Sequence, residues 1–263
     1  MHELVQTVSA LAVEAGHAIM AIYQDEIAVT RKEDNSPLTQ ADLAAHHTIM
    51  DGLAKLTPEL PVISEESTSI PYSEREKWNR YWLVDPLDGT REFIKRNGEF
   101  TVNIALIEAH RPVLGVVYAP AMGLLFYAAK GHGAFRQLAG RAPERLHARH
   151  FDPTRITVAG SRSHAGERLL RFLDRIGPHM LISMGSSLKI CLIAEGRADV
   201  YPRLGPTSEW DTAAGQCVLE EAGGTIQGTD GQVLRYNTKD SLLNPEFFAI
   251  GPGSRDWSKY LVD

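Results

Sequence analysis

Hydrophobic positions recur every three or four residues near the start of the chain, where residues 4–22 read LVQTVSALAVEAGHAIMAI. This spacing predicts an amphipathic helix, because positions three and four apart share one face of an α-helix. Glu3 and Glu14 interrupt the run, so it predicts neither a secretory signal nor a membrane span of about 20 apolar residues. A second helix is predicted after residue 39, with Thr39 as its N-cap.

Short runs of branched and aromatic residues then predict strands. A brief extended segment at 61–67 precedes the apolar run at 81–85, and further runs cover 102–108, 113–119 and 124–130. Turn residues at Arg111-Pro112 and from Pro120 to Gly123 separate the last three runs. This order is typical of an antiparallel meander.

The second half of the chain has a different pattern. Between residues 136 and 155 the chain is rich in Arg and His and lacks apolar periodicity, which predicts a boundary between an N-terminal α+β lobe (1–150) and a C-terminal α/β lobe (151–263). Strands and helices then alternate. The predicted class is α/β with α+β layering in two closely packed lobes, the later strands lying at 156–160, 180–184, 198–204 and up to 248, and the helices at 163–176, 187–195 and 211–221.

Composition and charge narrow the function. With 263 residues, 43% of them hydrophobic, the chain is long enough to bury a substantial core. Its net charge of −6 argues against a broad nucleic-acid surface, which needs cations clustered over one face. We therefore expect no nucleic-acid partner. Cys191 and Cys217 form no CxxC pair, so both are expected to be reduced structural residues, and the expected location is the cytoplasm.

The strongest chemical signal is the motif Asp85-Pro-Leu-Asp88-Gly-Thr90, directly after a buried apolar run. Two carboxylates at the exit of a buried strand are costly unless a cation compensates them. Magnesium prefers such hard oxygen ligands, including a free carbonyl such as that of Leu87. Gly89 permits a close backbone approach, and the amides near Thr90 could hold a phosphate.

Asp85 and Asp88 could instead have a purely structural role, because Asp often caps turns and helices. Further acidic residues at strand ends or helix starts favour a shared cleft instead. They are Glu65 and Glu66 after an apolar pair, Asp42 near the start of its helix, and Asp211 at a helix start, where it could be either a cap or a ligand.

Three segments together resemble a known family: ISEES at 63–67, DPLDGT at 85–90 and EWDTAAGQCVLEEAGG at 209–224. They are similar to the lithium-sensitive, magnesium-dependent phosphatases of the inositol-monophosphatase superfamily, and the resemblance covers nearly the whole chain. The stretch from DGTREF to NIALI, with GSRSH at 160–164 and GSSLK at 185–189, resembles in particular its CysQ-type 3′(2′),5′-bisphosphate nucleotidases. The resemblance implies an αβαβα sandwich.

The resemblance also implies roles for individual residues. It assigns two or three Mg²⁺ ions to Glu65, Asp85, the Leu87 carbonyl, Asp88 and Asp211, with Glu66 in a supporting position. Asp42 and Thr90, together with Glu65, would serve the attacking water, and the amides of Gly89 and Thr90 would bind the scissile phosphate. The implied substrate contacts are Glu65, Leu87, Asp88, Gly89, Thr90, Ser161, His164, Ser186, Ser187, Lys189, Arg203 and Asp211.

The choice of substrate depends on the second lobe. Inositol-specific relatives carry a Glu before the WD motif, whereas this chain has Arg203 there, and a cation favours an anionic group. Lys189, near a helix start after two serines, suits a second phosphate. The plainer alternatives are that Ser161 is a helix cap, His164 a surface residue and Arg203 a partner of a nearby carboxylate.

The function implied is hydrolysis of 3′-phosphoadenosine 5′-phosphate to AMP and phosphate, as in sulfur metabolism. One alternative is an inositol- or sugar-phosphate monophosphatase, which needs the same metal centre with a neutral pocket. Another is a nucleotide-sensing protein without catalysis. The sequence leaves open homodimer formation, loose association with the cytoplasmic face of the membrane, and the strength of lithium inhibition.

Overall fold

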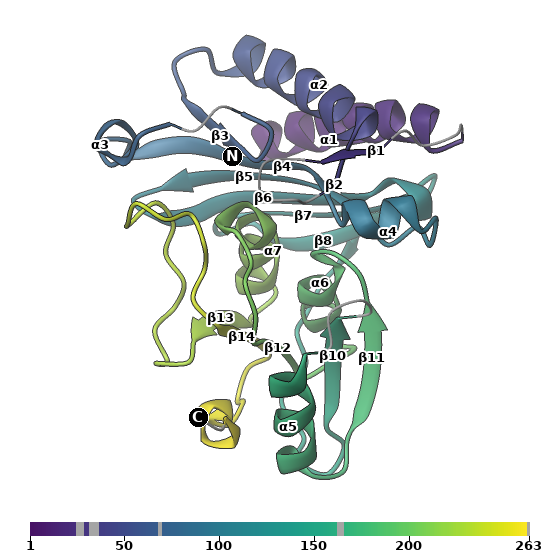
Figure 1. Ribbon diagram of the computed structural model, residues 1–263, viewed down its shortest axis with the longest axis vertical. Helices are drawn as coiled ribbons and strands as arrows, with labels where there is room; N and C mark the ends of the chain where they lie inside the picture. The colour runs from purple at the N-terminus through teal and green to yellow at the C-terminus, as the bar shows by residue number, and fades with distance from the viewer. Residues whose placement is uncertain (25–28, 32–36, 68–69, 162–165, 262–263) are drawn as a thin grey trace.

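The computed structural model describes residues 1–24, 29–31, 37–67, 70–161 and 166–261. Five layers follow one another along its long axis, in the order helices, sheet, helices, sheet, helices (Figure 1). The predicted αβαβα layering is therefore confirmed. Three clusters of buried apolar side chains fill the spaces between the layers.

The first layer contains α1 (His2–Tyr23) and α2 (Gln40–Leu56), as the apolar spacing predicts. By length and composition α1 alone would qualify as a membrane span among the described residues. Its buried side chains, including Val8, Ala12 and Ile19, share one core with Trp82 of the neighbouring sheet. That packing accounts for the apolar face of α1 without a membrane.

The second layer is a seven-stranded sheet in sequential order from β3 to β9. β3 and β4 are parallel and all later pairs are antiparallel, which confirms the predicted meander. The strands are β3 (Val62–Ser64), β4 (Arg80–Asp88), β5 (Thr101–Glu108), β6 (Arg111–Ala119), β7 (Leu124–Ala129), β8 (Gly133–Leu138) and β9 (Glu144–Arg145).

Neither β8 nor β9 was predicted, because their side chains do not alternate between apolar and polar. β9 is exposed and β8 is buried only at its start. Backbone pairing of β8 with β7 and of β9 with β8, and the contact from Arg136 to Glu144 (2.8 Å), hold the last two strands of the sheet instead. Short elements outside this sheet are β1 (Val29–Arg31), β2 (Pro37–Thr39), α3 (Tyr72–Arg75), α4 (Thr90–Ile94) and η1 (Pro120–Met122).

The middle layer contains α6 (Leu188–Ala194) and α7 (Glu209–Glu221). Although α7 comes from the second half of the chain, it packs against β5 and β6 of the first sheet. Gly115 of β6 makes this approach possible, since a Cβ there would lie 2.3 Å from the carbonyl oxygen of Ala214. Cys191 and Cys217 are buried and unpaired, as expected for reduced structural residues.

The second sheet has the strand order β11, β10, β12, β14, β13 and carries α5 and η2 on its outer face (Figure 1). The predicted strands and helices all occur, although α5 begins at Glu167 and not near residue 163, because Gly166 is extended and forms its N-cap. The elements are β10 (Thr157–Ser161), α5 (Glu167–Ile176), β11 (Met180–Met184), β12 (Val200–Arg203), β13 (Thr225–Gly228), β14 (Phe247–Ile250) and η2 (Trp257–Tyr260).

Candidate active site

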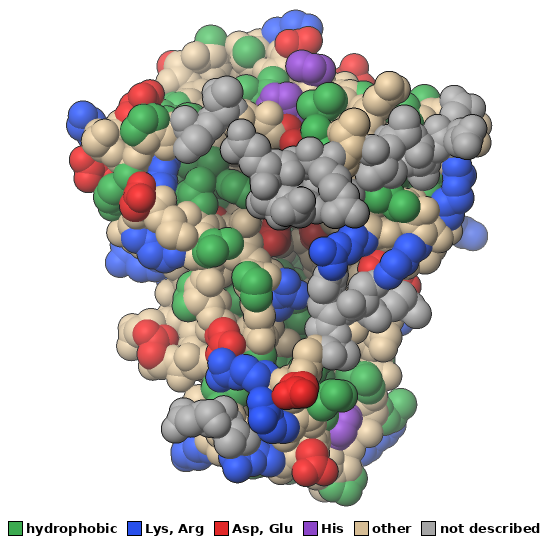
Figure 2. All heavy atoms as spheres, viewed as in Figure 1, with side chains coloured by type: hydrophobic (Ala, Val, Ile, Leu, Met, Phe, Trp, Pro, Cys, Tyr) green, Lys and Arg blue, Asp and Glu red, His purple; other side chains and the backbone are tan. Residues whose placement is uncertain are grey.

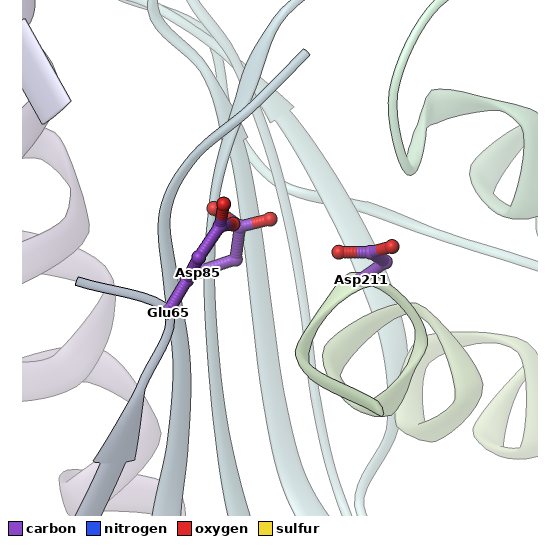
Figure 3. Close-up of side chains that lie close together, drawn as sticks. All are labelled: Glu65, Asp85 and Asp211. Atoms are coloured by element: carbon purple, nitrogen blue, oxygen red, sulfur yellow. The ribbon is translucent and has the colours of Figure 1, made fainter. Parts of the chain in front are cut away.

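Three carboxylates from distant parts of the sequence meet between the first sheet and α7. Glu65 directly follows β3, Asp85 lies in β4, and Asp211 lies in the first turn of α7. One carboxylate oxygen from each lies within 4.8 Å of the other two. Figure 3 shows Glu65 and Asp85 close together, with Asp211 facing them from the helix. This is a suitable spacing for ligands of one divalent cation.

The raised pKa values of these carboxyl groups also favour a bound divalent cation. Burial, followed by the charges of Glu65 and Asp88, raises the pKa of Asp85 well above its usual value. Burial and the charges of Asp88 and Glu65 likewise raise the pKa of Asp211 to about 8. Three acidic side chains are thus held together against their mutual repulsion. A bound cation would offset the repulsion between the carboxylates, since it stabilises the ionised form of each one.

Binding of Mg²⁺ should therefore displace protons near neutral pH. Because the pKa of Asp211 is about 8 in the metal-free protein, that carboxyl is largely protonated at pH 7 and must ionise to bind the ion. The apparent affinity for Mg²⁺ should rise from pH 6 to pH 8 by about tenfold per pH unit for each proton displaced. Titration calorimetry in two buffers of different ionisation enthalpy counts these protons. An affinity and a proton count that do not change with pH would contradict the prediction.

Asp88 lies at the end of β4, beyond a shift in strand register between Asp85 and Asp88. Its Oδ2 accepts hydrogen bonds from the backbone amide (2.6 Å) and the hydroxyl (2.7 Å) of Ser187. Asp88 lines the same pocket as Glu65 and Asp211. The structure thus brings together the four acidic side chains that the resemblance assigns to magnesium.

Asp42 and Thr90 come together from α2 and α4. Asp42 is buried, and its Oδ2 accepts from the amide (2.8 Å) and the hydroxyl (2.6 Å) of Thr39, the N-cap residue. Its Oδ1 accepts from the Thr90 hydroxyl at 3.2 Å, and the Leu87 carbonyl lies 3.4 Å from the same hydroxyl. Thr90 therefore links the motif after β4 to a fixed carboxylate.

Asp42 and Asp211 are helix caps and members of the site at the same time. Each occupies the third position of its helix and completes a capping box, Asp42 with Thr39 and Asp211 with Ser208. The Ser208 amide donates to Asp211 Oδ2 at 2.9 Å. The sequence left open whether Asp211 is a helix cap or a ligand. It can be both, because one carboxylate oxygen can serve the cap while the other faces the cleft.

Gly89 makes the turn from β4 into α4. It has φ +92°, in the left-handed region that glycine adopts at no steric cost, and a Cβ there would lie 3.2 Å from the Glu99 carbonyl oxygen. Gly89 and Thr90 both line the pocket. The backbone of the motif can thus approach a bound group closely.

A pocket lies next to the carboxylates and also contains cationic side chains. Figure 2 shows acidic side chains deep in a recess on this face, with Lys and Arg side chains close by. Its walls come from both halves of the chain, which places the recess between the two sheets. The lining residues are Glu65, Asp88, Gly89, Thr90, Arg91, Glu92, Ser161, Gly185, Ser186, Ser187, Lys189, Ile190, Tyr201, Arg203, Thr207, Asp211, Thr212 and Phe247.

Lys189 is a buried cation in the wall of this pocket. Its Nζ donates to the carbonyl of Ser186 at 2.5 Å and lies 5.4 Å from the centre of the Tyr201 ring. Burial lowers its pKa to about 8, although the charge of Asp88 acts in the opposite direction. The ammonium is therefore mostly charged at pH 7. Arg203 lines the same pocket and donates to the carbonyls of Gly205 and Pro206.

The remaining predicted substrate residues differ in their positions. Ser161 and Ser186 line the pocket, and His164 lies outside the described residues. Ser187 also lines it, but its hydroxyl contacts Asp88 and the Asp211 backbone. Sequence reasoning overlooked Asn103, whose amide donates to Ser187. A polar residue inside the otherwise apolar strand VNIALI was the available signal.

Comparison with known proteins agrees with this geometry. The model of the "Inositol monophosphatase family" matches residues 1–253. The chain is 49% identical to "3′(2′),5′-bisphosphate nucleotidase CysQ" of Salmonella typhimurium over 93% of its length and 98% of that protein. It is 50% identical to the protein of the same name from Escherichia coli K12, again over 93% of its length and 98% of that protein.

Solved structures give the same result. A crystal structure of CysQ from Bacteroides thetaiotaomicron, titled a bacterial member of the inositol monophosphatase family, has a TM-score of 0.82 and 40% identity, covering 96% of this chain and 98% of that one. A Thermotoga maritima IMPase has a TM-score of 0.80 and 25% identity, and the match covers 99% of this chain and 96% of that one. The expected sandwich fold is thereby confirmed.

Proposed function

Since this chain belongs to the inositol monophosphatase family, we propose that it is a magnesium-dependent phosphomonoesterase that hydrolyses 3′-phosphoadenosine 5′-phosphate to AMP and phosphate. The observation that carries the chemistry is the convergence of Glu65, Asp85 and Asp211 beside a pocket lined by Arg91, Lys189 and Arg203. The relatives at 49–50% identity, which bear the name of a bisphosphate nucleotidase, support the substrate.

The donor set fits magnesium. Only oxygen ligands converge here, with no His or Cys in the cluster of described residues, and such a set favours a hard cation. Bound Mg²⁺ would neutralise charge on the phosphoryl oxygens and make a nearby water more acidic. We propose two or three ions, held by Glu65, Asp85, Asp88, Asp211 and the carbonyl of Leu87.

Thr90 and Asp42 are proposed to handle the proton of the attacking water. The Thr90 hydroxyl already donates to Asp42 (3.2 Å), so its oxygen can accept a proton from water while its own proton moves to the carboxylate. The water oxygen then forms the new bond to phosphorus, and the bond from phosphorus to the ester oxygen breaks. The leaving oxygen takes a proton from solvent and Asp42 releases one to solvent, which balances the reaction. Amides of Gly89 and Thr90 are proposed to hold the phosphoryl group.

The second phosphate of the substrate is proposed to lie near Lys189 and Arg203. Both line the pocket, and the buried Lys189 ammonium lies in a setting of low polarity, where its attraction to an anion is stronger than in water. Ser161 and Ser186 line the same pocket and could donate hydroxyl protons. A neutral polyol such as inositol has no charge to pair with these cations.

A phosphate-release assay with and without Mg²⁺ tests this proposal. We expect kcat/KM for 3′-phosphoadenosine 5′-phosphate to exceed that for inositol 1-phosphate by about 100-fold or more, because the uncharged inositol ring offers no second anion to Lys189 and Arg203. Turnover should be lost when EDTA removes the metal. A preference for inositol 1-phosphate would identify the polyol phosphatase alternative, and binding of nucleotide without phosphate release would identify a sensor.

A matched variant separates the substrate from the metal chemistry. Lys189→Met keeps the length and apolar stem of the side chain but removes its charge. Loss of one charge-assisted contact should lower kcat/KM for the bisphosphate by about 10- to 100-fold. Turnover of inositol 1-phosphate should change far less. Equal losses with both substrates would show that Lys189 supports the site rather than binding the second phosphate.

Other expectations stay predictions. Location in the cytoplasm, contact with its membrane face, homodimer formation and inhibition by lithium are inferred only from the sequence and its resemblance. The lobe boundary at residue 150 and the role of His164 have the same standing.

A further inference from the structure

Ser187 connects three segments of the site through one hydroxyl group. Its Oγ lies 2.7 Å from Asp88 Oδ2 at the end of β4 and 2.7 Å from the carbonyl oxygen of Asp211 in α7. The amide nitrogen of Asn103, in β5, donates to the same Oγ at 2.8 Å. Ser187 itself directly precedes α6. The hydroxyl thus joins the first sheet to both helices of the middle layer.

Proton counting favours Asn103 as a donor to Ser187, because the other two partners of the hydroxyl are acceptors. A serine hydroxyl has one proton to donate and can accept others. If Asn103 presented its oxygen to Ser187, the hydroxyl would have to donate to Asn103, and no proton would separate Ser187 Oγ from the Asp88 carboxylate at 2.7 Å. With Asn103 as donor, the single Ser187 proton has two acceptors left, the Asp88 carboxylate and the Asp211 carbonyl, and the charged carboxylate is the stronger acceptor. Donation by Asn103 also polarises the hydroxyl and strengthens its own hydrogen bond.

This arrangement leaves the side-chain oxygen of Asn103 without a hydrogen bond to any described residue. Its side chain is buried, and within the described part of the chain its Oδ1 has no hydrogen-bond partner. Asn103 also pairs with Asp85 across β4 and β5, so the amide lies beside the carboxylate cluster. A buried amide with an unpaired oxygen lowers stability, because that oxygen loses its hydrogen bonds to water. The amide therefore contributes to the site rather than to folding stability.

We propose that Ser187 is a positioning residue for Asp88 rather than a contact for the substrate, and that Asn103 acts through Ser187. The amide and hydroxyl of Ser187 occupy the two lone pairs of Asp88 Oδ2, so Oδ1 is the oxygen that remains for a cation. Such contacts orient a ligand before the metal binds. The inference deepens the proposed function, since it takes Asp88 as part of the magnesium site.

Direct metal binding tests this role without relying on activity. Ser187→Ala removes the hydroxyl and keeps the backbone amide, and it should weaken Mn²⁺ binding, measured by calorimetry without substrate, about 10- to 100-fold. Ser187→Thr retains a hydroxyl and should restore most of the affinity. Ser9→Ala is the matched control, because it makes the same substitution in α1 and removes a buried hydroxyl without a partner among the described residues. It should leave Mn²⁺ affinity unchanged.

Kinetics at saturating Mg²⁺ distinguish positioning from substrate contact. Ser187→Ala should change KM for 3′-phosphoadenosine 5′-phosphate by less than about threefold, since KM rises with kcat unchanged when a uniform substrate contact is lost. A large rise in KM with unchanged Mn²⁺ affinity would overturn the proposal. A lower melting temperature with unchanged Mn²⁺ affinity would also overturn it and leave a purely structural role.

A double substitution tests whether Asn103 acts on Asp88 through Ser187. If Asn103 acts through Ser187, the Asn103→Ala/Ser187→Ala variant should bind Mn²⁺ no more weakly than Ser187→Ala alone. Additive losses would contradict the part assigned to Asn103. These measurements remain decisive even if the wild type fails to hydrolyse the bisphosphate, because that failure would refute the substrate and leave the Mn²⁺ affinities to decide the role of Ser187.

Discussion

Asp85→Asn is expected to reduce turnover by roughly 10³-fold or more, because the metal contributes several kcal/mol to the transition state and this side chain is its most buried proposed ligand. The same change should stabilise the metal-free protein. Asn has nearly the same shape as Asp, but it carries no charge. It therefore removes both the cost of burying that charge and the repulsion from Glu65 and Asp88 that raises the pKa of Asp85.

The sign of the stability effect follows from proton linkage. In the wild type the pKa of Asp85 is raised on folding, so the native state holds a proton that the unfolded state releases. Stability is therefore lost as pH rises above the unfolded pKa of about 4 towards the raised native value. In Asp85→Asn this loss is absent. The melting temperature in EDTA should exceed that of the wild type by several degrees at pH 7, since 1 kcal/mol corresponds to about 2–4 °C for a chain of this size.

Thermal denaturation with EDTA and with Mg²⁺ separates the two effects. Mg²⁺ should raise the melting temperature of the wild type much more than that of Asp85→Asn. Asp51→Asn, on the exposed face of α2, is the control and should behave as the wild type in both conditions. A variant that is both active and unchanged in stability would remove Asp85 from the metal site.

Thr90→Val should lower kcat by about 10²- to 10⁴-fold, the usual contribution of a proton transfer through a positioned side chain. Valine matches threonine in shape and lacks the hydroxyl that donates to Asp42. Thr90→Ser retains that hydroxyl and should stay within about tenfold of the wild type. Mn²⁺ affinity should change little in either variant. If Thr90→Val remains as active as Thr90→Ser, the water loses its proton by another route.

Local chemistry made much of the site predictable. The DPLDGT motif combines two carboxylates with a glycine that the backbone requires, since Gly89 adopts φ +92°. Strand runs such as VNIALIE and VLGVVYA have buried side chains on both faces, because helices cover both sides of the first sheet. Periodicity and turn residues were therefore sufficient for the elements and for the antiparallel meander of the first sheet, whereas the layering came from the family resemblance.

What the sequence did not show depends on contacts between distant segments. Arg136 of β8 and Glu144 of β9 join the last two strands of the first sheet, which no apolar pattern marks. The Ser187 hydroxyl was predicted to contact substrate, but its orientation depends on Asn103, 84 residues earlier in the chain. Spacing along the sequence cannot indicate which of two adjacent serines contacts a carboxylate.

The central claim is that Glu65, Asp85 and Asp211 bind one divalent cation between the first sheet and α7. Anomalous diffraction from a crystal of the wild type grown with Mn²⁺ tests it most directly. The account predicts a strong Mn²⁺ peak within bonding distance of all three carboxylates, at about 2.0–2.3 Å, as expected for a hard cation with oxygen ligands. A fully occupied Mn²⁺ ion elsewhere, with these three side chains uncoordinated, would contradict it.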